Sequence, residues 1–212
     1  MTAPPQTDQA MNFTAPAPGG TFIIEPGVTF VGALTTDGGA AIGTLVLNTA
    51  SVYQGAVGNP AILQITLNGD ATIQGATGAQ NFSLGQNTLT NTGALNLPSG
   101  LVLNTRVISD TVFGNIDATG FADSISGSSI TVNVDASGVT SLTDGQPLFI
   151  IAASGTTNGL PVIVTSNNIL WSFTGLNVTG NVEIFPTFHP PASLVTNPIA
   201  AGSVGAILPA LT

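Results

Sequence analysis

Basic side chains are almost absent from this 212-residue chain. Lys and Arg together occur once, as Arg106, against ten Asp and Glu residues, so the formal net charge is −9. Proteins that bind nucleic acids neutralise phosphates with Lys and Arg, and attraction to anionic lipid headgroups uses the same side chains. The composition therefore argues against nucleic acids and anionic membrane surfaces as partners. The lack of lysine also excludes Schiff-base and P-loop chemistry.

Cysteine is absent, and histidine occurs once, at His189 in a Phe-His-Pro-Pro segment. Without cysteine the chain can form no disulfide, no thiolate metal site and no cysteine nucleophile. A single imidazole with no second histidine makes a poor metal site. A Ser-His-Asp triad would have to use His189, and the sequence has no G-x-S-x-G turn. We therefore expect His189 to lie in a linker, with no metal site, no cofactor and no catalytic residue.

Charged residues make up only 5% of the chain, whereas hydrophobic residues make up 43%. Disordered proteins combine low hydrophobicity with high net charge, so this composition favours a packed fold. No apolar run approaches the roughly 18 to 20 residues of a membrane-spanning helix. The opening segment, MTAPPQTDQAMNF, has neither the basic nor the apolar region of a signal peptide. The chain is then either cytosolic or a mature or excised piece of something longer, and we favour the excised piece, without membrane insertion by this segment.

Short apolar pulses separated by turn-forming residues run through most of the chain. Between residues 61 and 105 they alternate with polar residues, as in Leu63, Ile65 and Leu67, which is the period of a strand with one buried face. No stretch long enough for a helix carries an apolar stripe at 3.6-residue spacing. We therefore predict an all-β fold. The expected strands outside 61–105 include 21–24, 28–31, 43–49, 107–108, 112–116, 124–125, 130–134, 147–152, 162–165, 169–173 and 182–185.

The pentapeptide LVLNT occurs twice, at residues 45–49 and 101–105. Three repeats of about 19 residues fit between the two copies, near the repeat lengths of solenoid proteins. Residues 63–69 and 95–100 fit as degenerate intermediate copies. The pattern predicts a β-solenoid over residues 21–185, and the leading hypothesis for it is a right-handed parallel β-helix. A β-sandwich with Greek-key connections is the alternative, because short strands alone fit both folds.

Proline-rich segments flank the predicted strands. Residues 1–20 are expected to form an arm or cap with one edge strand near 12–14, and residues 186–212 a Pro-broken apolar tail or linker. A solenoid needs caps, because open strand edges invite further pairing. We expect the second cap in the region 149–188, which holds most of the C-terminal aromatic residues.

The run from Gly93 to Gly155 resembles the C-terminal part of an autotransporter passenger, the secreted β-helix of type V secretion. The residues that carry the likeness are a G-x-I-x-A-x-G stretch at 114–120 and an L-x-D-G-Q turn at 142–146 followed by LFIIAASG. Residues 168–185, with Trp171, resemble the strands that close such a helix near the membrane. Rickettsia-like surface antigens of low charge are the nearest type. The resemblance implies an extracellular or bacterial cell-surface protein, possible partners being a host surface protein or glycan.

Four carboxylates, Asp110, Asp117, Asp123 and Asp135, lie close together in the sequence. Some β-helix hydrolases use clustered carboxylates to cleave glycosidic bonds. Asp is also a common turn residue between strands, and we take that as the better reading. Arg106 is expected to act as a structural hydrogen-bond donor or as the partner of Asp110. Glycosylation sequons occur at Asn12, Asn81 and Asn177 and matter only in a eukaryotic secretory pathway.

The leading functional hypothesis is a non-enzymatic surface protein: a passenger segment that serves as stalk, scaffold or adhesin on a bacterial envelope. Its almost uncharged, Thr- and Asn-rich composition suits contacts with glycans or proteins. The alternative is a self-assembling extracellular filament or surface-layer subunit, since low charge and open strand edges favour pairing between copies. A polysaccharide-cleaving β-helix enzyme is the third and weakest hypothesis.

Overall fold

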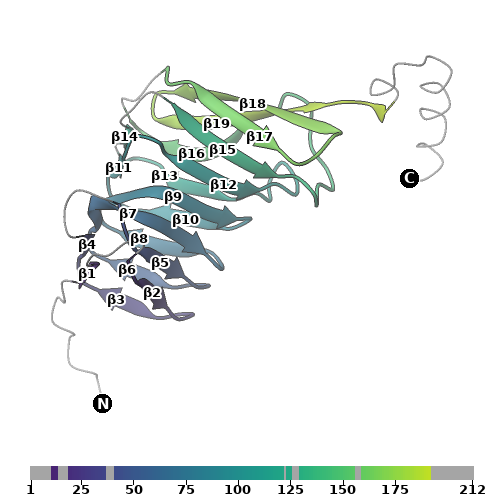
Figure 1. Ribbon diagram of the computed structural model, residues 1–212. Coiled ribbons are helices and arrows are strands. Elements are labelled where there is room, and N and C mark those ends of the chain that lie inside the picture. Colours follow the sequence, from purple (N-terminus) through teal and green to yellow (C-terminus); the bar gives the residue numbers. More distant parts are fainter. Residues whose placement is uncertain are drawn as a thin grey trace.

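The computed structural model describes residues 11–13, 19–36, 41–121, 123–125, 129–155 and 159–191. Its regular structure consists of one 11-stranded and one 8-stranded sheet (Figure 1). The described part of the chain contains no α-helix, which confirms the predicted all-β class. No described segment forms a helix that is long and apolar enough to cross a membrane.

The chain passes back and forth between the two sheets, often with two successive strands in the same sheet. The first sheet contains β1 (Met11–Phe13), β2 (Thr21–Ile24), β4 (Leu34–Thr36), β5 (Thr44–Leu47), β7 (Val57–Leu67), β9 (Thr77–Gly85), β11 (Leu95–Leu97), β12 (Val102–Arg106), β14 (Asp123–Ile125), β15 (Ile130–Asp135) and β17 (Val162–Ser166). The second contains β3 (Thr29–Val31), β6 (Val52–Gln54), β8 (Ala71–Gln74), β10 (Thr88–Asn91), β13 (Asn115–Ala118), β16 (Leu148–Ala153), β18 (Trp171–Val178) and β19 (Asn181–Phe188).

Strand pairing is mostly parallel. Among the named strands only the pairs β16–β19 and β18–β19 are antiparallel, and the others, from β2–β5 to β15–β17, run parallel. A Greek-key sandwich consists of antiparallel sheets, so the pairing argues against that alternative. After each pass of the chain across both sheets, a strand lies beside the one from the previous pass, and Figure 1 shows the strands stacked in this order from β2 and β3 to β18 and β19.

The register of the first sheet tests the repeat that the sequence suggested. Leu45 pairs with Ile65, Ile65 with Phe82, and Phe82 with Leu103. The two LVLNT copies therefore lie three passes apart in the same sheet, as expected, but Leu45 aligns with Leu103 and not with Leu101. A two-residue shift keeps every side chain on its own face, because the side-chain period of a strand is two.

One expected copy of the repeat was misplaced. The sequence predicts an intermediate copy at residues 95–100, but Leu95 of β11 pairs with Thr77 at the start of β9, in a separate row of strands. The second half of β9 is the intermediate copy instead. Passes also vary in length: partners on adjacent passes are 18 residues apart at Asn81 and Leu63 but 32 apart at Thr165 and Asn133. A constant period of about 19 residues therefore holds only locally.

The core lies between the sheets and is built from alternate strand positions. In β15, for example, Ile130, Val132 and Val134 are buried, while the residues between them are partly exposed. Burying such a side chain contributes roughly 1.5 to 3 kcal/mol. Tyr53 also lies in the core, against Phe30 with ring centroids 5.1 Å apart. Burial raises the pKa of its hydroxyl, which has no hydrogen-bond partner among the described residues.

A column of glycines lets successive passes approach closely at the corner after the first four strands of the second sheet, β3, β6, β8 and β10. Gly32, Gly55, Gly75 and Gly93 stand in this column, and each is followed by alanine. A Cβ on Gly75 would lie 2.5 Å from the carbonyl carbon of Gly55 and closer still to its oxygen. Gly55 and Gly93 meet the carbonyl group of the preceding glycine in the same way. Only a residue without a side chain fits these positions.

An antiparallel hairpin, β18–β19, ends the second sheet within the region where the second cap was expected (Figure 1). Its Trp171 packs against Phe188, with ring centroids 5.0 Å apart. β19 runs to Phe188, past the expected start of the tail at residue 186. β1 pairs with β4 and matches the edge strand expected near 12–14. The rest of the expected arm, apart from residues 19 and 20, and residues 192–212 lie outside the described residues.

Candidate functional site

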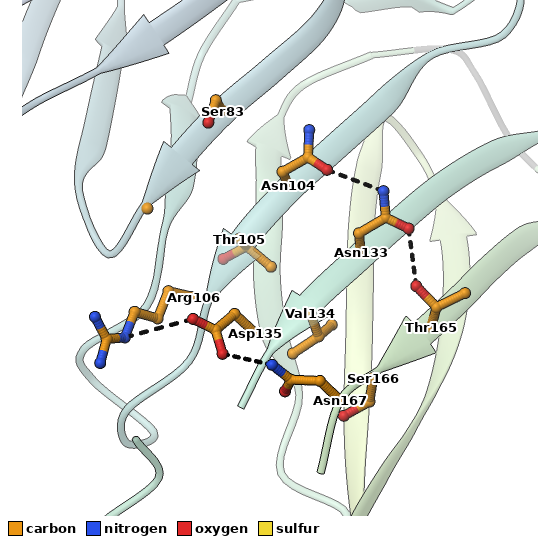
Figure 2. A pocket seen from close by; sticks show the side chains of 11 residues that line it. Ser83, Asn104, Thr105, Arg106, Asn133, Val134, Asp135, Thr165, Ser166 and Asn167 are labelled. Atoms are coloured by element: carbon orange, nitrogen blue, oxygen red, sulfur yellow. Dashed lines mark hydrogen bonds and ion pairs between the residues drawn. The ribbon is translucent and has the colours of Figure 1, made fainter. Parts of the chain in front are cut away.

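A groove of about 490 Å³ runs along the outer face of the first sheet (Figure 2). It crosses β9, β12, β15 and β17, whose outward positions supply most of its lining. We call it the lateral groove. It is lined by Ser83, Gly85, Asn104, Thr105, Arg106, Asn133, Val134, Asp135, Thr165, Ser166 and Asn167.

Arg106 and Asp135 form an ion pair in the groove, with Arg106 Nε 3.8 Å from Asp135 Oδ2. The two residues stand opposite each other in the register of β12 and β15. The expectation that Arg106 pairs with Asp110 was therefore wrong, because strand register and not sequence proximity brings its partner to it. Both side chains are almost half exposed, at 47% and 44%, so the pair is screened by solvent and adds little stability.

Hydrogen bonds hold the carboxylate of Asp135 in place. Asn167 Nδ2 donates to Asp135 Oδ1 over 2.8 Å, and Ser137 donates to the same oxygen from its hydroxyl over 2.7 Å and from its backbone N–H over 3.1 Å. These bonds, led by that of Asn167, lower the pKa of Asp135 to about 2, and the nearby Arg106 charge adds to the effect. Donors to a carboxylate stabilise its charged form, so Asp135 is ionised at neutral pH.

Amides and hydroxyls form a ladder across the middle of the groove (Figure 2). Asn133 Nδ2 donates to Asn104 Oδ1 over 2.9 Å, and Thr165 Oγ1 donates to Asn133 Oδ1 over 2.8 Å. Asn104 Nδ2 is held by the backbone carbonyl of Phe82 at 3.2 Å. These residues occupy one register row of β12, β15 and β17. The ladder fixes the amide orientations without any ligand.

The other carboxylates of the sequence cluster have separate structural roles. Asp110 accepts hydrogen bonds from the hydroxyl and the backbone N–H of Thr143, at 2.6 and 3.0 Å, and so ties two loops together. Asp117 lies in β13 of the second sheet and accepts from the backbone N–H of Thr119, as a turn residue does. The side chain of Asp123 lies outside the described part. The structure thus does not gather Asp110, Asp117 and Asp135 in one place.

His189 was expected in a linker, but it follows directly after β19 and is half-buried. Its backbone N–H donates to the carbonyl of Leu170 over 2.7 Å, and its Nε2 lies 2.7 Å from Ser172 Oγ. A serine and a histidine in contact resemble two members of a catalytic triad. Asp144 is bonded to the residue before His189: its Oδ1 accepts a hydrogen bond from the backbone N–H of Phe188 and not from the imidazole. The described residues thus show a serine–histidine pair without a carboxylate bonded to the ring.

Two of the three sequon asparagines are held within the fold by burial and hydrogen bonds. Asn177 is only 1% exposed, and its Nδ2 donates to the carbonyl of Asn181. Asn81 is partly buried and donates to the carbonyl of Leu63. Both amides are used within the fold, and neither is presented as an acceptor for a glycan. The side chain of Asn12 lies outside the described part.

The lateral groove was not predicted from the sequence. Its residues are spread from Ser83 to Asn167 and come together only through the register of β9, β12, β15 and β17. The alternation of polar and apolar residues in TVNVD, at 131–135, could have indicated an outward polar row, but not the strands beside it. Within the part of the chain that the structure describes, no three His, Asp or Glu side chains stand close enough to hold a metal ion. Comparison with protein-family models, curated proteins and solved structures finds no match to this chain.

Proposed function

We propose that this chain is a non-enzymatic, extracellular β-solenoid: a right-handed parallel β-helix that acts as a stalk, scaffold or adhesin on a bacterial surface. One observation carries the proposal, namely the mostly parallel strand pairing that places each pass of the chain on the one before it. Right-handedness follows from the rule for connections between parallel strands. The autotransporter-like passenger remains the family that the sequence resembles.

The surface chemistry agrees with a scaffold that makes contacts and performs no reaction. The outer faces carry mainly amides and hydroxyls, as in the row Ser83, Asn104, Asn133 and Thr165 of the first sheet. The carboxylates that could share acid and base work lie apart, Asp117 on one sheet and Asp135 on the other. A glycosidase of the common kind needs two carboxyl groups facing one bond.

Electron microscopy of the purified chain tests the architecture. A solenoid of this kind is expected to give a short rod with a repeat of about 4.8 Å along its axis, which is the spacing of hydrogen-bonded strands. A compact particle without that repeat would refute it. Surface location is tested separately, by antibody labelling of intact and lysed cells of the organism that encodes the chain. Labelling that requires lysis would overturn the extracellular assignment.

Self-assembly is a second candidate function, because two strands at one end of the stack have an edge that no described strand pairs with. Among the described strands β2 pairs only with β5, and β3 only with β6. Phe22 and Phe30 pack edge to face there, at 4.9 Å, beside a hollow of about 200 Å³. Ile23, which follows Phe22 in β2, is half exposed. An apolar edge without lysine or a bulge is a template for pairing with another chain.

We propose that a second copy of the chain is the partner of this edge. Sedimentation velocity over a concentration series is expected to show association, and Ile23→Lys should abolish it, since a charged edge strand opposes pairing. The matched control is Val112→Lys, which changes an exposed apolar residue that lies outside the named strands, between β12 and β13. A wild-type chain that stays monomeric at all concentrations would refute self-assembly and leave the scaffold proposal intact.

A further inference from the structure

We propose that the lateral groove binds a neutral oligosaccharide. This inference rests on the proposed function, because it gives the surface scaffold an adhesive site and names its ligand class. The groove is a shallow, open site of about 490 Å³ on the outer face of the first sheet. That volume falls in the range of small-ligand sites.

The lining offers hydrogen-bonding groups of both kinds in fixed positions. Asn104 and Asn133 are held in the ladder, yet each side-chain carbonyl oxygen has a second lone pair. The hydroxyl of Ser83 has no hydrogen-bond partner among the described residues, and the guanidinium of Arg106 contacts Asp135 only through Nε. A sugar hydroxyl both donates and accepts. It can therefore accept from Arg106 or Ser83 and donate to the amide oxygens or to Asp135.

The polar side chains of the lateral groove are already held in fixed orientations, which favours the binding of a ligand. Asn167 is fixed at both ends of its amide: Nδ2 donates to Asp135, and Oδ1 accepts from the backbone N–H of Ala136 over 2.8 Å. Groups already held in one orientation lose little conformational entropy when a ligand arrives. Adjacent strands stand about 4.8 Å apart, so the ladder presents similar groups at regular intervals. A ligand made of repeated hydroxyl-bearing units fits this spacing better than a single small molecule.

Other ligand classes fit the groove less well. A peptide that extends a sheet needs a free edge. β12 and β15, which form the middle of the groove, are each paired on both sides, so such a peptide could add only beside β17 at the end of the sheet and would not occupy the groove. An anionic ligand would meet a chain of net charge −9, whose only basic residue already faces Asp135. An apolar ligand would have to strip water from the amides and hydroxyls without replacing their hydrogen bonds, which costs free energy.

The test is affinity electrophoresis in native gels that contain a soluble neutral polysaccharide: dextran, galactomannan or xyloglucan, each in its own gel. Polygalacturonate is the anionic comparison. We expect retardation by at least one neutral polymer and none by polygalacturonate. Retardation by none of the three neutral polymers, or by polygalacturonate alone, would overturn the proposal.

Variants locate the binding. Asn133→Ala removes the central rung of the ladder and should weaken binding about tenfold or more, since it deletes hydrogen-bonding groups for the ligand and releases Asn104 and Thr165. Ser83→Ala combined with Arg106→Ala is the second variant, because these side chains contribute little to the fold. Thr90→Ala is the matched control on the outer face of the second sheet, in β10. Equal retardation of wild type and both groove variants would refute the assignment of the site.

The two proposals can fail separately. Electron microscopy of the same preparations reports whether the chain is a rod, whatever the gels show. A rod that no neutral polymer retards would refute the saccharide site alone, whereas a compact particle would refute the proposed architecture.

Discussion

The glycine column makes the sharpest test of the stacked architecture. Gly75 follows β8, and its backbone conformation is not in the left-handed region, so an alanine there suffers no conformational penalty. The obstacle is the pass beneath it: a Cβ would lie 2.5 Å from the carbonyl carbon of Gly55 and nearer to the oxygen. Both neighbours are backbone atoms and cannot rotate away. Gly75→Ala should therefore force two passes apart.

The magnitude follows from what holds those passes together. Reaching ordinary van der Waals distance requires a movement on the order of 1 Å. On either side of Gly75, Gly55 N–H donates to the carbonyl of Gln74 over 3.1 Å, and Val57 N–H donates to that of Ala76 over 2.8 Å. Losing or stretching two such bonds costs about 1 to 3 kcal/mol each when the groups stay buried. Against this, alanine lowers the entropy of the unfolded chain by about 0.4 to 1 kcal/mol. We expect a net destabilisation of about 3 kcal/mol.

Urea unfolding followed by far-UV circular dichroism measures the effect. The matched control is Gly120→Ala, because Gly120 has φ near +86° and open space around its Cβ position. A left-handed alanine costs about 1 to 2 kcal/mol, so Gly75→Ala should be the more damaging of the two. An account based on backbone conformation alone predicts the reverse order. If Gly75→Ala unfolds at the wild-type urea concentration, the close packing of passes at this corner is refuted.

Three further predictions concern the core, a buried hydrogen bond and pH. Leu103 is fully buried in the middle of the stack, so Leu103→Ala should lower the free energy of unfolding by about 2 to 5 kcal/mol in the urea experiment. The control is Ile163→Ala, at a position 53% exposed, which should change that free energy by less than about 0.5 kcal/mol. Thr77→Val removes the hydroxyl that donates to buried Asn91 Oδ1 over 2.6 Å. Leaving that oxygen without its donor should lower the free energy of unfolding by about 1 to 3 kcal/mol. The double variant with Asn91→Leu should lose less than the sum of the two single changes. The pKa of Asp135 is lowered from 3.8 to about 2, so its contribution to stability is present above about pH 4 and is lost as the pH falls toward 2. Between pH 4 and pH 2 the free energy of unfolding should therefore fall more for the wild type than for Asp135→Asn. Equal falls would contradict the hydrogen bonds that Asp135 accepts in the folded state.

Local patterns in the sequence were enough to predict most of the strands, although the strand expected at 107–108 is only an isolated bridge at Val107 and the one expected at 112–116 begins at Asn115. The segment 21–24 was expected as a strand and forms β2 with the same bounds, and 130–134 lies within β15. Alternation of apolar and polar residues reports which face is buried, and Gly, Asn and Asp mark the turns. Both signals act over a few residues and need no knowledge of neighbouring strands. The all-β class was therefore predictable from the sequence alone.

Long-range register was not predictable in the same way. The repeat LVLNT indicated the right sheet but the wrong alignment, because passes differ in length and no constant period applies. The Gly-Ala dipeptide, which recurs after Val31, Gln54, Gln74 and Thr92, marks the passes better. It recurs at this corner because the backbones of successive passes approach closely there. Arg106 illustrates the limit: Asp110 is near in sequence, but Asp135 is opposite in register.

The scarcity of charge in the composition has a structural cause in this stacking. Parallel strands in register place equivalent side chains about 4.8 Å apart in columns. Two like charges at that distance repel by about 1 kcal/mol even in water, and a column multiplies the cost. Neutral amides attract instead, as Asn68 Nδ2 does when it donates to Asn48 Oδ1 over 3.0 Å, and as Asn133 does with Asn104. Where charges do face each other between adjacent strands, as at Arg106 and Asp135, their signs are opposite. The same rule that keeps the faces neutral also leaves them lined with amides and hydroxyls, which is why an adhesive site on such a sheet would favour a neutral, hydroxyl-rich ligand.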